Sequence, residues 1–246
     1  MTKPVPSSIR FQNNQLKGRV YLVTGASGGL GGATALALSK LGASVILSGR
    51  NEKKLDSLYD TIEAENCPQA AIIPFDLALT DAQIYEQLAH SIYNEFKRLD
   101  GIVHAACHLG VIGPLASQEA SEWLKTQQVN VNACLLINKA CAPLLLQSDA
   151  ASITAISDSS ARQNKAYWGA YGVSKSALET FSAILADEYE NSPINCNVFI
   201  PGPCVLPVRK KTHPGEEVDG LSTTEALTDA ILQVIHSEQS GQRYSL

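Results

Sequence analysis

The chain has 246 residues, of which 45% are hydrophobic, enough apolar side chain for one large domain with its own core. Its formal net charge is −5 and its pI is about 5.5, whereas nucleic-acid binding requires a basic face. No apolar run is long enough to span a bilayer, and the opening residues 1–4 are not the start of a signal peptide. We therefore expect a cytoplasmic protein with neither a nucleic-acid nor a membrane partner.

Short apolar strands alternate with longer amphipathic segments along the chain. The first 15 residues are polar and are predicted to form a flexible extension. Apolar runs predict strands at 20–23, 44–47, 71–73, 101–103, 151–156, 196–200 and 243–245. Apolar residues at helical spacing predict helices at 31–41, 52–65, 81–96, 123–146, 170–189 and 225–236.

This alternation is typical of a mostly parallel sheet with helices on both faces. No linker rich in Pro, Gly or Ser divides the chain, and the sequence contains no internal repeat. We therefore predict an α/β protein whose residues 16–246 form a single-domain Rossmann fold, with a doubly wound, mostly parallel seven-stranded sheet.

A glycine-rich turn follows the strand at 20–23 and leads directly into a helix. Glycine allows the backbone to turn sharply and to approach a pyrophosphate closely, and the helix start offers N–H groups and a partial positive charge. The alternative is a glycine-rich turn without a ligand. The strand before and the helix after favour a dinucleotide site that includes Gly25, Ser27, Gly28, Gly29, Leu30 and Gly31.

Four motifs together resemble the short-chain dehydrogenase/reductases, and within them the bacterial YciK-type oxidoreductases. They are Thr24-Gly25-x-x-x-Gly29-x-Gly31, Asn130, Tyr171-x-x-x-Lys175 and Pro201-Gly202, and the resemblance runs from about residue 16 to the end. It implies hydride transfer between a nicotinamide and a carbonyl or alcohol, and a homodimer or homotetramer paired through the helices 123–146 and 170–189. It also implies cofactor contacts from Asp76, Leu77, Ala105, Ala106, Lys175, Pro201 and Gly202.

The end of the second strand bears on which dinucleotide is bound. An acidic residue there would bind the ribose 2′-hydroxyl of NAD and repel a 2′-phosphate. This chain has Gly49 in that position and Arg50 next to it, and a guanidinium holds phosphate through two hydrogen bonds. The sequence therefore predicts NADP(H). The alternative is that Arg50 is only a solvated residue at a helix start.

Tyr171 and Lys175 are four residues apart on a predicted helix and so share a face. A nearby ammonium lowers the pKa of a phenol, ordinarily about 10, and assists proton exchange with the substrate. By resemblance, Lys175 also binds the nicotinamide ribose and Asn130 holds a water that links the lysine to solvent. An ordinary helix kink or cap is the alternative for Asn130. A second copy of the pattern, Tyr93 with Lys97, is assigned to a solvated helix face.

The family's catalytic serine lies thirteen residues before the tyrosine, where this chain has Asp158. An ionised aspartate only accepts hydrogen bonds, and losing a donor there costs about 3–4 kcal/mol of transition-state stabilisation. A carboxylate about 4 Å from a phenolate adds about 4 kcal/mol of repulsion. Three alternatives stay open: Asp158 is protonated and donates, Ser157 or Ser159 takes the site, or Asp158 binds a cationic or hydroxyl-rich substrate.

Three further positions, in two segments, depart from the family. The Asn-Ala-Gly motif is replaced by Ala105-Ala106-Cys107, which loses an amide that pins the central strands and crowds the nicotinamide. Leu206 replaces the threonine that follows Pro-Gly. Two interpretations result: an NADP(H)-dependent carbonyl/alcohol oxidoreductase with Tyr171 as acid/base, or an NADP(H)-binding protein with little or no turnover and a structural or regulatory role.

The cysteines and histidines and one basic run are the remaining candidates for a function. The six cysteines form no C-x-x-C pair, and His104, Cys107 and His108 lack a second ligand pair, so no metal site is predicted. The segment 203–221 is expected to form a short, polar substrate lid. Its basic run, 209–211, either meets an anionic substrate or is a solvated loop.

Overall fold

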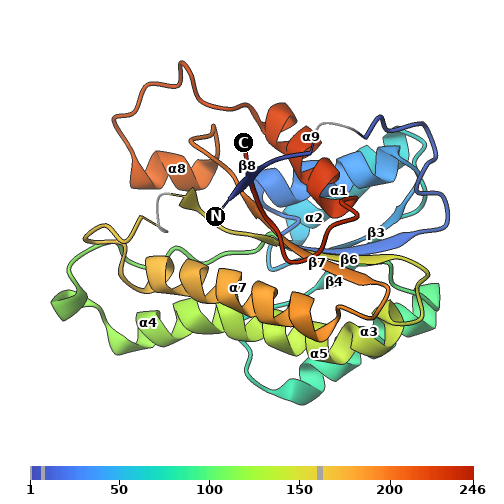
Figure 1. Cartoon of the computed structure of the whole chain (residues 1–246), viewed down its shortest axis with the longest axis horizontal. Coiled ribbons are helices and arrows are strands. Elements are labelled where there is room, and N and C mark those ends of the chain that lie inside the picture. The colour runs from blue at the N-terminus through green and yellow to red at the C-terminus, as the bar shows by residue number, and fades with distance from the viewer. Residues whose placement is uncertain (1, 7–8, 160–162) are drawn as a thin grey trace.

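Eight parallel strands form the centre of the computed structural model, which describes residues 2–6, 9–159 and 163–246 (Figure 1). The strand order is β1-β8-β7-β6-β5-β2-β3-β4, and each neighbouring pair is parallel. The strands are β1 (Lys3–Pro4), β2 (Val20–Thr24), β3 (Ser44–Gly49), β4 (Ala71–Pro74), β5 (Gly101–His104), β6 (Ala151–Ile156), β7 (Ile194–Ile200) and β8 (Arg243–Ser245).

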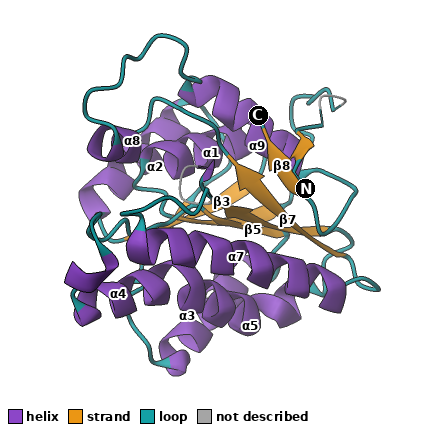
Figure 2. Cartoon of the chain, turned by 60° about the vertical axis from the view of Figure 1, so that its left-hand side comes forward, coloured by secondary structure: helices purple, strands orange, loops and turns teal. Residues whose placement is uncertain are grey.

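Helices cover both faces of the sheet and bury an apolar core on each (Figures 1 and 2). One face carries α1 (Gly29–Lys40), α2 (Glu52–Ala64) and α9 (Thr224–Ile235). The other carries α3 (Ala82–Phe96), α4 (Ala120–Gln127), α5 (Ala133–Leu145) and α7 (Gly169–Glu188). A short helix, α8 (Pro207–Thr212), lies in the segment between β7 and α9. A 3-10 turn, Leu115–Ser117, precedes α4.

The predicted doubly wound parallel sheet is confirmed, with element ends moved by a few residues. The described residues form eight strands rather than the expected seven, because Lys3 and Pro4 pair with Tyr244 and Ser245 at the sheet edge. A two-residue strand has no periodicity that a sequence pattern can reveal. Of the predicted extension 1–15, residues 1, 7 and 8 lie outside the described residues, and its flexibility stays a prediction.

The helix expected at 123–146 is wrong as a single α-helix. A π-helical turn, Gln128–Asn132, divides it into α4 and α5, and Asn130 is the middle residue of this turn. Such turns are found mostly within helices at functional sites. Pro143 is tolerated near the end of α5, where the helix stops two residues later.

The order in which strands are added to the sheet reverses between the neighbouring strands β2 and β5. From β2 the chain crosses to β3 and β4 on one side, and β5 begins the series on the other side. In such sheets the ligand crevice lies at the carboxyl ends of the strands at this reversal. The turn after β2 needs a glycine, because Gly25 has φ +70° and a Cβ there would lie 2.6 Å from the Ala106 Cα.

A buried ionic cluster holds the opposite, amino ends of the central strands. The Asp100 carboxylate accepts hydrogen bonds from Arg98 at 2.6 Å, Ser148 at 2.6 Å and the Val20 N–H at 2.8 Å. Arg19 pairs with it at 3.0 Å. Burial by itself raises the pKa of this carboxyl, but its donors outweigh burial and lower the pKa below its ordinary value. The cluster ties β2, β5 and β6 together far from the crevice.

Candidate functional site

A cleft of about 380 Å³ opens at the carboxyl ends of the central strands. Its walls come from the glycine turn, the ends of β3 to β6, the start of α7 and the segment that carries α8. All predicted site residues except Asn130 line it: Gly25, Ser27, Gly28, Gly29, Leu30, Gly31, Arg50, Asp76, Leu77, Ala105, Ala106, Asp158, Tyr171, Lys175, Pro201 and Gly202.

The glycine turn forms a close-fitting backbone cradle at the start of α1. The Gly28 N–H donates to the Gly25 carbonyl at 2.8 Å, and a Cβ on Gly31 would lie 2.4 Å from that same carbonyl oxygen. Among the described residues, no side chain caps the start of α1, and its first turn holds no acidic residue. The positive end of this helix therefore faces the cleft, which suits a phosphate group.

Polar and basic side chains gather where β3 ends. A Cβ on Gly49 would lie 2.9 Å from the Ser27 Oγ, so this hydroxyl takes the space that an acidic side chain would need. Arg50 and Lys54 line the cleft beside it. Sequence reasoning missed Lys54, although its position four residues after Arg50, in the first turn of a helix, was a usable signal.

Thr24 links the neighbouring strands β2 and β5 next to Ala105. Its hydroxyl donates to the Val103 carbonyl at 3.4 Å and accepts from the Ala106 N–H at 3.4 Å. Both hydrogen bonds are long. They join the end of β2 to β5 and to the loop that follows it.

Tyr171 and Lys175 both lie in the first turns of α7, with side chains that are almost completely buried. The Lys175 Nζ donates to the Ile156 carbonyl at 2.7 Å and lies 5.6 Å from the centre of the Tyr171 ring. Burial, followed by Cys107 and Asp158, raises the pKa of Tyr171 well above its ordinary value. The net shift is upward, opposite to the lowering expected from Lys175, because burial is its largest cause.

The structure decides which side chain stands beside the tyrosine. The Tyr171 hydroxyl donates to the Asp158 Oδ2 at 3.2 Å. The Ser157 hydroxyl instead donates to Glu179 at 2.7 Å, and the Ser159 hydroxyl donates to the Pro201 carbonyl at 3.3 Å. The alternative in which a flanking serine takes the site is therefore wrong.

Asn130 lies in the π-helical turn, buried behind the cleft rather than in its wall. Its Oδ1 accepts from the His108 N–H at 2.7 Å, and its Nδ2 donates to the His108 carbonyl at 2.9 Å and to the Ser174 Oγ at 2.8 Å. The side chain thus fixes the loop after β5 against α7. A role in holding a water for Lys175 stays a prediction.

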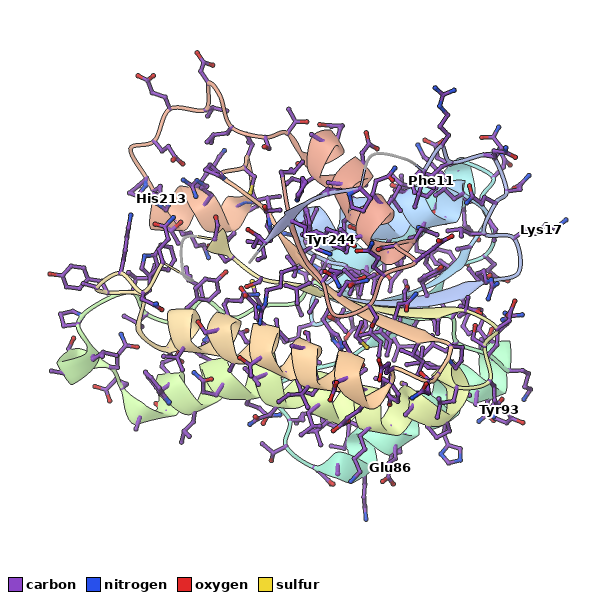
Figure 3. All side chains as sticks on the ribbon, viewed as in Figure 1. Phe11, Lys17, Glu86, Tyr93, His213 and Tyr244 are labelled. Atoms are coloured by element: carbon purple, nitrogen blue, oxygen red, sulfur yellow. The ribbon has the colours of Figure 1, made fainter. Side chains whose placement is uncertain are left out.

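The segment carrying α8 covers one side of the cleft. Arg209 lines the cleft and is tied to Glu216 by two contacts of 2.6 Å, while Lys210 and Lys211 are exposed. Figure 3 shows His213 at this end of the molecule; its ring lies 6.1 Å from that of Trp168. The Trp168 ring in turn lies 5.9 Å from that of Tyr171, so aromatic side chains link the lid to the tyrosine.

The second Tyr-Lys pair lies on the surface, as predicted. The Lys97 Nζ is 4.7 Å above the exposed Tyr93 ring at the end of α3, across the molecule from His213 in Figure 3. Its position excludes it from the cleft.

The described residues contain no group of three or more His, Cys, Asp or Glu side chains placed to hold a metal ion. His104 is buried and contacts Asn138 at 3.3 Å, and burial lowers its pKa to about 4. In the part of the chain that the structure describes, no helix has the length and apolarity to cross a membrane.

Comparison with known proteins identifies the family. Residues 19–217 match the family model for short chain dehydrogenases. The chain belongs to the short-chain dehydrogenase family. Over 208 residues it is 40% identical to the uncharacterized oxidoreductase YciK of Escherichia coli K12, covering 85% of this chain and 82% of that protein. The predicted resemblance, including the YciK type, is confirmed, and this short-chain dehydrogenase is a member of an oxidoreductase family.

Solved structures of relatives share the whole fold. A short chain dehydrogenase of Shigella flexneri 2a complexed with NADP has a TM-score of 0.89 and 35% identity, over 95% of this chain and 99% of its own. One from E. coli CFT073 complexed with NADPH has a TM-score of 0.90 and 36% identity, over 95% and 98%. The predicted cofactor, NADP(H), agrees with the cofactors of these neighbours.

Proposed function

We propose that the protein is an NADP(H)-dependent oxidoreductase that interconverts a carbonyl group and an alcohol. One observation carries the proposal: a single cleft joins the glycine cradle and Arg50 at one end to Tyr171 and Lys175 at the other. A dinucleotide bound at the cradle would extend its nicotinamide toward the tyrosine, as in the topology that the fold provides.

The residues present fit this cofactor. A Cβ on Gly31 would lie 2.4 Å from the Gly25 carbonyl oxygen, so the cradle requires glycine at this position. Ser27, Arg50 and Lys54 would hold a 2′-phosphate, and the neighbours complexed with NADP and NADPH support that choice. When bound, the nicotinamide supplies or accepts a hydride.

Tyr171 would exchange the proton that accompanies the hydride. Because its pKa is raised, the phenol keeps its proton at neutral pH and acts as a donor to a carbonyl oxygen. A protonated phenol is the state from which the reduction of a carbonyl starts. Lys175 is oriented by the Ile156 carbonyl and would bind the nicotinamide ribose with its remaining N–H groups.

A second candidate is a protein that binds NADP(H) without efficient turnover. The contact between Asp158 and Tyr171 favours it, because an ionised carboxylate supplies no donor to a reacting oxygen and opposes a phenolate. In this case cofactor occupancy would serve a structural or regulatory role.

NADPH oxidation, measured with a broad panel of ketones and aldehydes, distinguishes the two candidate functions. The enzyme proposal expects turnover that Tyr171→Phe abolishes while NADPH still binds. Tight NADPH binding without oxidation, in the wild-type chain and in Asp158→Ser, would contradict it and favour the second candidate.

We also propose a homodimer or homotetramer that works in the cytoplasm. The helices α4, α5 and α7 lie side by side on one outer face (Figures 1 and 2), and they expose Leu124, Leu135 and Ile184 by 66%, 51% and 54%. Exposed apolar side chains gathered on one face mark interaction surfaces. Light scattering is expected to show an oligomer that the double variant Leu135→Glu/Ile184→Glu converts to monomer; a wild-type monomer would contradict this.

A further inference from the structure

We infer that Glu179 is a positioning residue for the proposed reaction, and that it acts by holding Ser157 at the end of β6. The inference rests on the proposed function and extends it to a residue outside the cleft lining. Because Glu179 does not line the cleft, it acts through other side chains and does not contact the reacting atoms.

Three residues of α7 form one stripe that faces the end of β6. They are four residues apart, so they lie on the same side of the helix. Each contacts one of three successive residues at the strand end: Tyr171 contacts Asp158 at 3.2 Å, Lys175 donates to the Ile156 carbonyl at 2.7 Å, and Glu179 accepts from the Ser157 Oγ at 2.7 Å. The first two contacts belong to the chemical end of the cleft. The third continues the same series one helical turn further along α7.

Ser157 is held from two sides. Its N–H donates to the Phe199 carbonyl at 2.8 Å, where the pairing of β6 with β7 ends. Its hydroxyl donates to Glu179, which ties the side chain to α7. Ile156 precedes Ser157 and Asp158 follows it, so a shift of Ser157 moves both neighbours through the shared backbone. The contact with Glu179 therefore contributes to the positions of both neighbours, which are the partners of the lysine and the tyrosine.

The charge of Glu179 is costly at this place. The residue is 3% exposed, and its Oε2 lies 3.3 Å from the Arg243 Nε in β8. Burial of a carboxylate is unfavourable, and apolar side chains of similar size often give stability equal to that of a buried ion pair or greater. A carboxylate offers something that an apolar side chain lacks: one oxygen accepts from Ser157 while the other pairs with Arg243. Packing alone does not require this acceptor for Ser157.

A purely structural role for Glu179 is the competing explanation. In that case the ion pair with Arg243 fastens the C-terminal strand to α7, and the contact with Ser157 is incidental to activity. The two explanations differ in the property that governs kcat. A positioning role makes kcat follow the acceptor for Ser157, whereas a structural role makes kcat follow the ion pair and the stability of the fold.

Two substitutions of Glu179 separate the acceptor from the charge. Both remove the ion pair with Arg243, so both are expected to lower the midpoint of urea unfolding. Glu179→Gln keeps an oxygen that accepts from Ser157, whereas Glu179→Leu has none. At a temperature where all the chains are folded, kcat of Glu179→Leu should fall by about 10- to 100-fold, since a misplacement of about 1 Å costs up to about 100-fold. Glu179→Gln should retain most of the wild-type kcat. KM and NADPH affinity should change little in both variants, because Glu179 does not line the cleft.

Ser157→Ala removes the other end of the same contact. Its loss of kcat should resemble that of Glu179→Leu, and the double variant should lose no more than the larger single loss, because one contact carries both effects. Ser182→Ala is the matched control. Ser182 is a buried serine of α7 whose hydroxyl donates to the Leu178 carbonyl of its own helix at 2.8 Å, so its removal should leave kcat unchanged.

A wild-type kcat in Glu179→Leu or in Ser157→Ala would overturn the inference, and so would equal losses in Glu179→Gln and Glu179→Leu or additive losses in the double variant. If the wild type reduces no ketone or aldehyde, the proposed function fails, and crystal structures of the wild type and Ser157→Ala decide the positioning role without turnover. The inference expects the contact of Lys175 with the Ile156 carbonyl, 2.7 Å in the wild type, to lengthen beyond hydrogen-bond distance in the variant. An unchanged contact would overturn it.

Discussion

Two aspartates lie near opposite ends of the parallel sheet, and their partners differ in kind. Asp100 precedes β5 at the amino end and accepts from Arg98, Arg19, Ser148 and a backbone N–H. Asp158 follows β6 at the carboxyl end and accepts from Tyr171. The donors of Asp100 are cationic or neutral groups that keep their protons, whereas one donor to Asp158 is a phenol with a proton to give.

The comparison shows how one residue type serves stability at one end of a sheet and chemistry at the other. Strong donors around a buried carboxylate favour its charge and fix the chain around it. A carboxylate placed against a proton donor disfavours the charged form of that donor. Burial and Cys107 contribute most to the raised pKa of Tyr171, and Asp158 contributes next. Variants at these two aspartates and at Tyr171 separate the two roles.

The largest effect is expected at the phenol itself. Tyr171→Phe removes the proton donor, and kcat should fall by about 10²- to 10⁴-fold, the usual contribution of general acid catalysis. NADPH affinity and the unfolding midpoint should change little, because the ring is retained. Steady-state kinetics and calorimetry measure both. Tyr93→Phe is the matched control, since Tyr93 also precedes a lysine by four residues but lies on the surface; equal losses in the two variants would refute the assignment.

Asp100→Ala is expected to lower the free energy of unfolding by about 1–3 kcal/mol, because it leaves the buried Val20 N–H without its acceptor. Urea unfolding measures the change. Asp158→Ala should lower stability by less than about 1 kcal/mol. A similar loss in both variants would show that the two ends of the sheet do not differ as described.

The acid dependence of stability has a defined sign. The folded state lowers the pKa of Asp100, so its contribution is present above the unfolded value of about 3.9 and is lost as pH falls through the folded pKa. Part of the acid destabilisation of the wild type should therefore be missing in Asp100→Ala. An identical dependence on pH in the two chains would contradict this.

Arg50→Ala is expected to weaken NADPH binding by about 10- to 100-fold, through loss of charge-assisted hydrogen bonds to the 2′-phosphate. NADH binding should be nearly unchanged, because NADH lacks that phosphate. Lys53→Ala provides the control, since Lys53 is exposed and lies outside the cleft lining. Parallel losses of NADPH and NADH affinity in Arg50→Ala would argue against the assigned role.

The smallest effect at neutral pH is expected from Asp158→Asn on the titration of Tyr171. Removing the negative charge should lower the pKa of Tyr171, so the alkaline loss of reductase activity should begin at a lower pH than in the wild type. Phenolate absorbance, with Tyr171→Phe as the reference, measures the same shift directly. Movement of the alkaline limb to higher pH would contradict the geometry.

The cofactor end of the cleft could be predicted from the sequence because it is made mostly of backbone. Gly25 and Gly31 are required by close approach, and a strand followed by glycines and a helix is a local pattern. The strand and helix periodicities likewise predicted the doubly wound sheet. The position of Arg50 in the cleft wall was predictable because the end of the second strand lies beside the ribose in this topology.

The chemical end was less predictable because it depends on side-chain directions and long-range contacts. The spacing of thirteen residues before Tyr171 indicated Asp158 but left Ser157 and Ser159 as alternatives. Only the partners of the two serines, Glu179 and the Pro201 carbonyl, exclude them. The π-helical turn around Asn130, the Thr24 link and the two-residue strand β1 have no local signature either.

The central claim is that the cleft holds NADP(H) between the glycine cradle and Tyr171, and calorimetric titration of the purified chain with NADPH and with NADH tests it most directly. The account predicts saturable binding of both, with NADPH bound at least about tenfold more tightly, or about 1.4 kcal/mol. Absence of binding for both dinucleotides, or tighter binding of NADH, would contradict it.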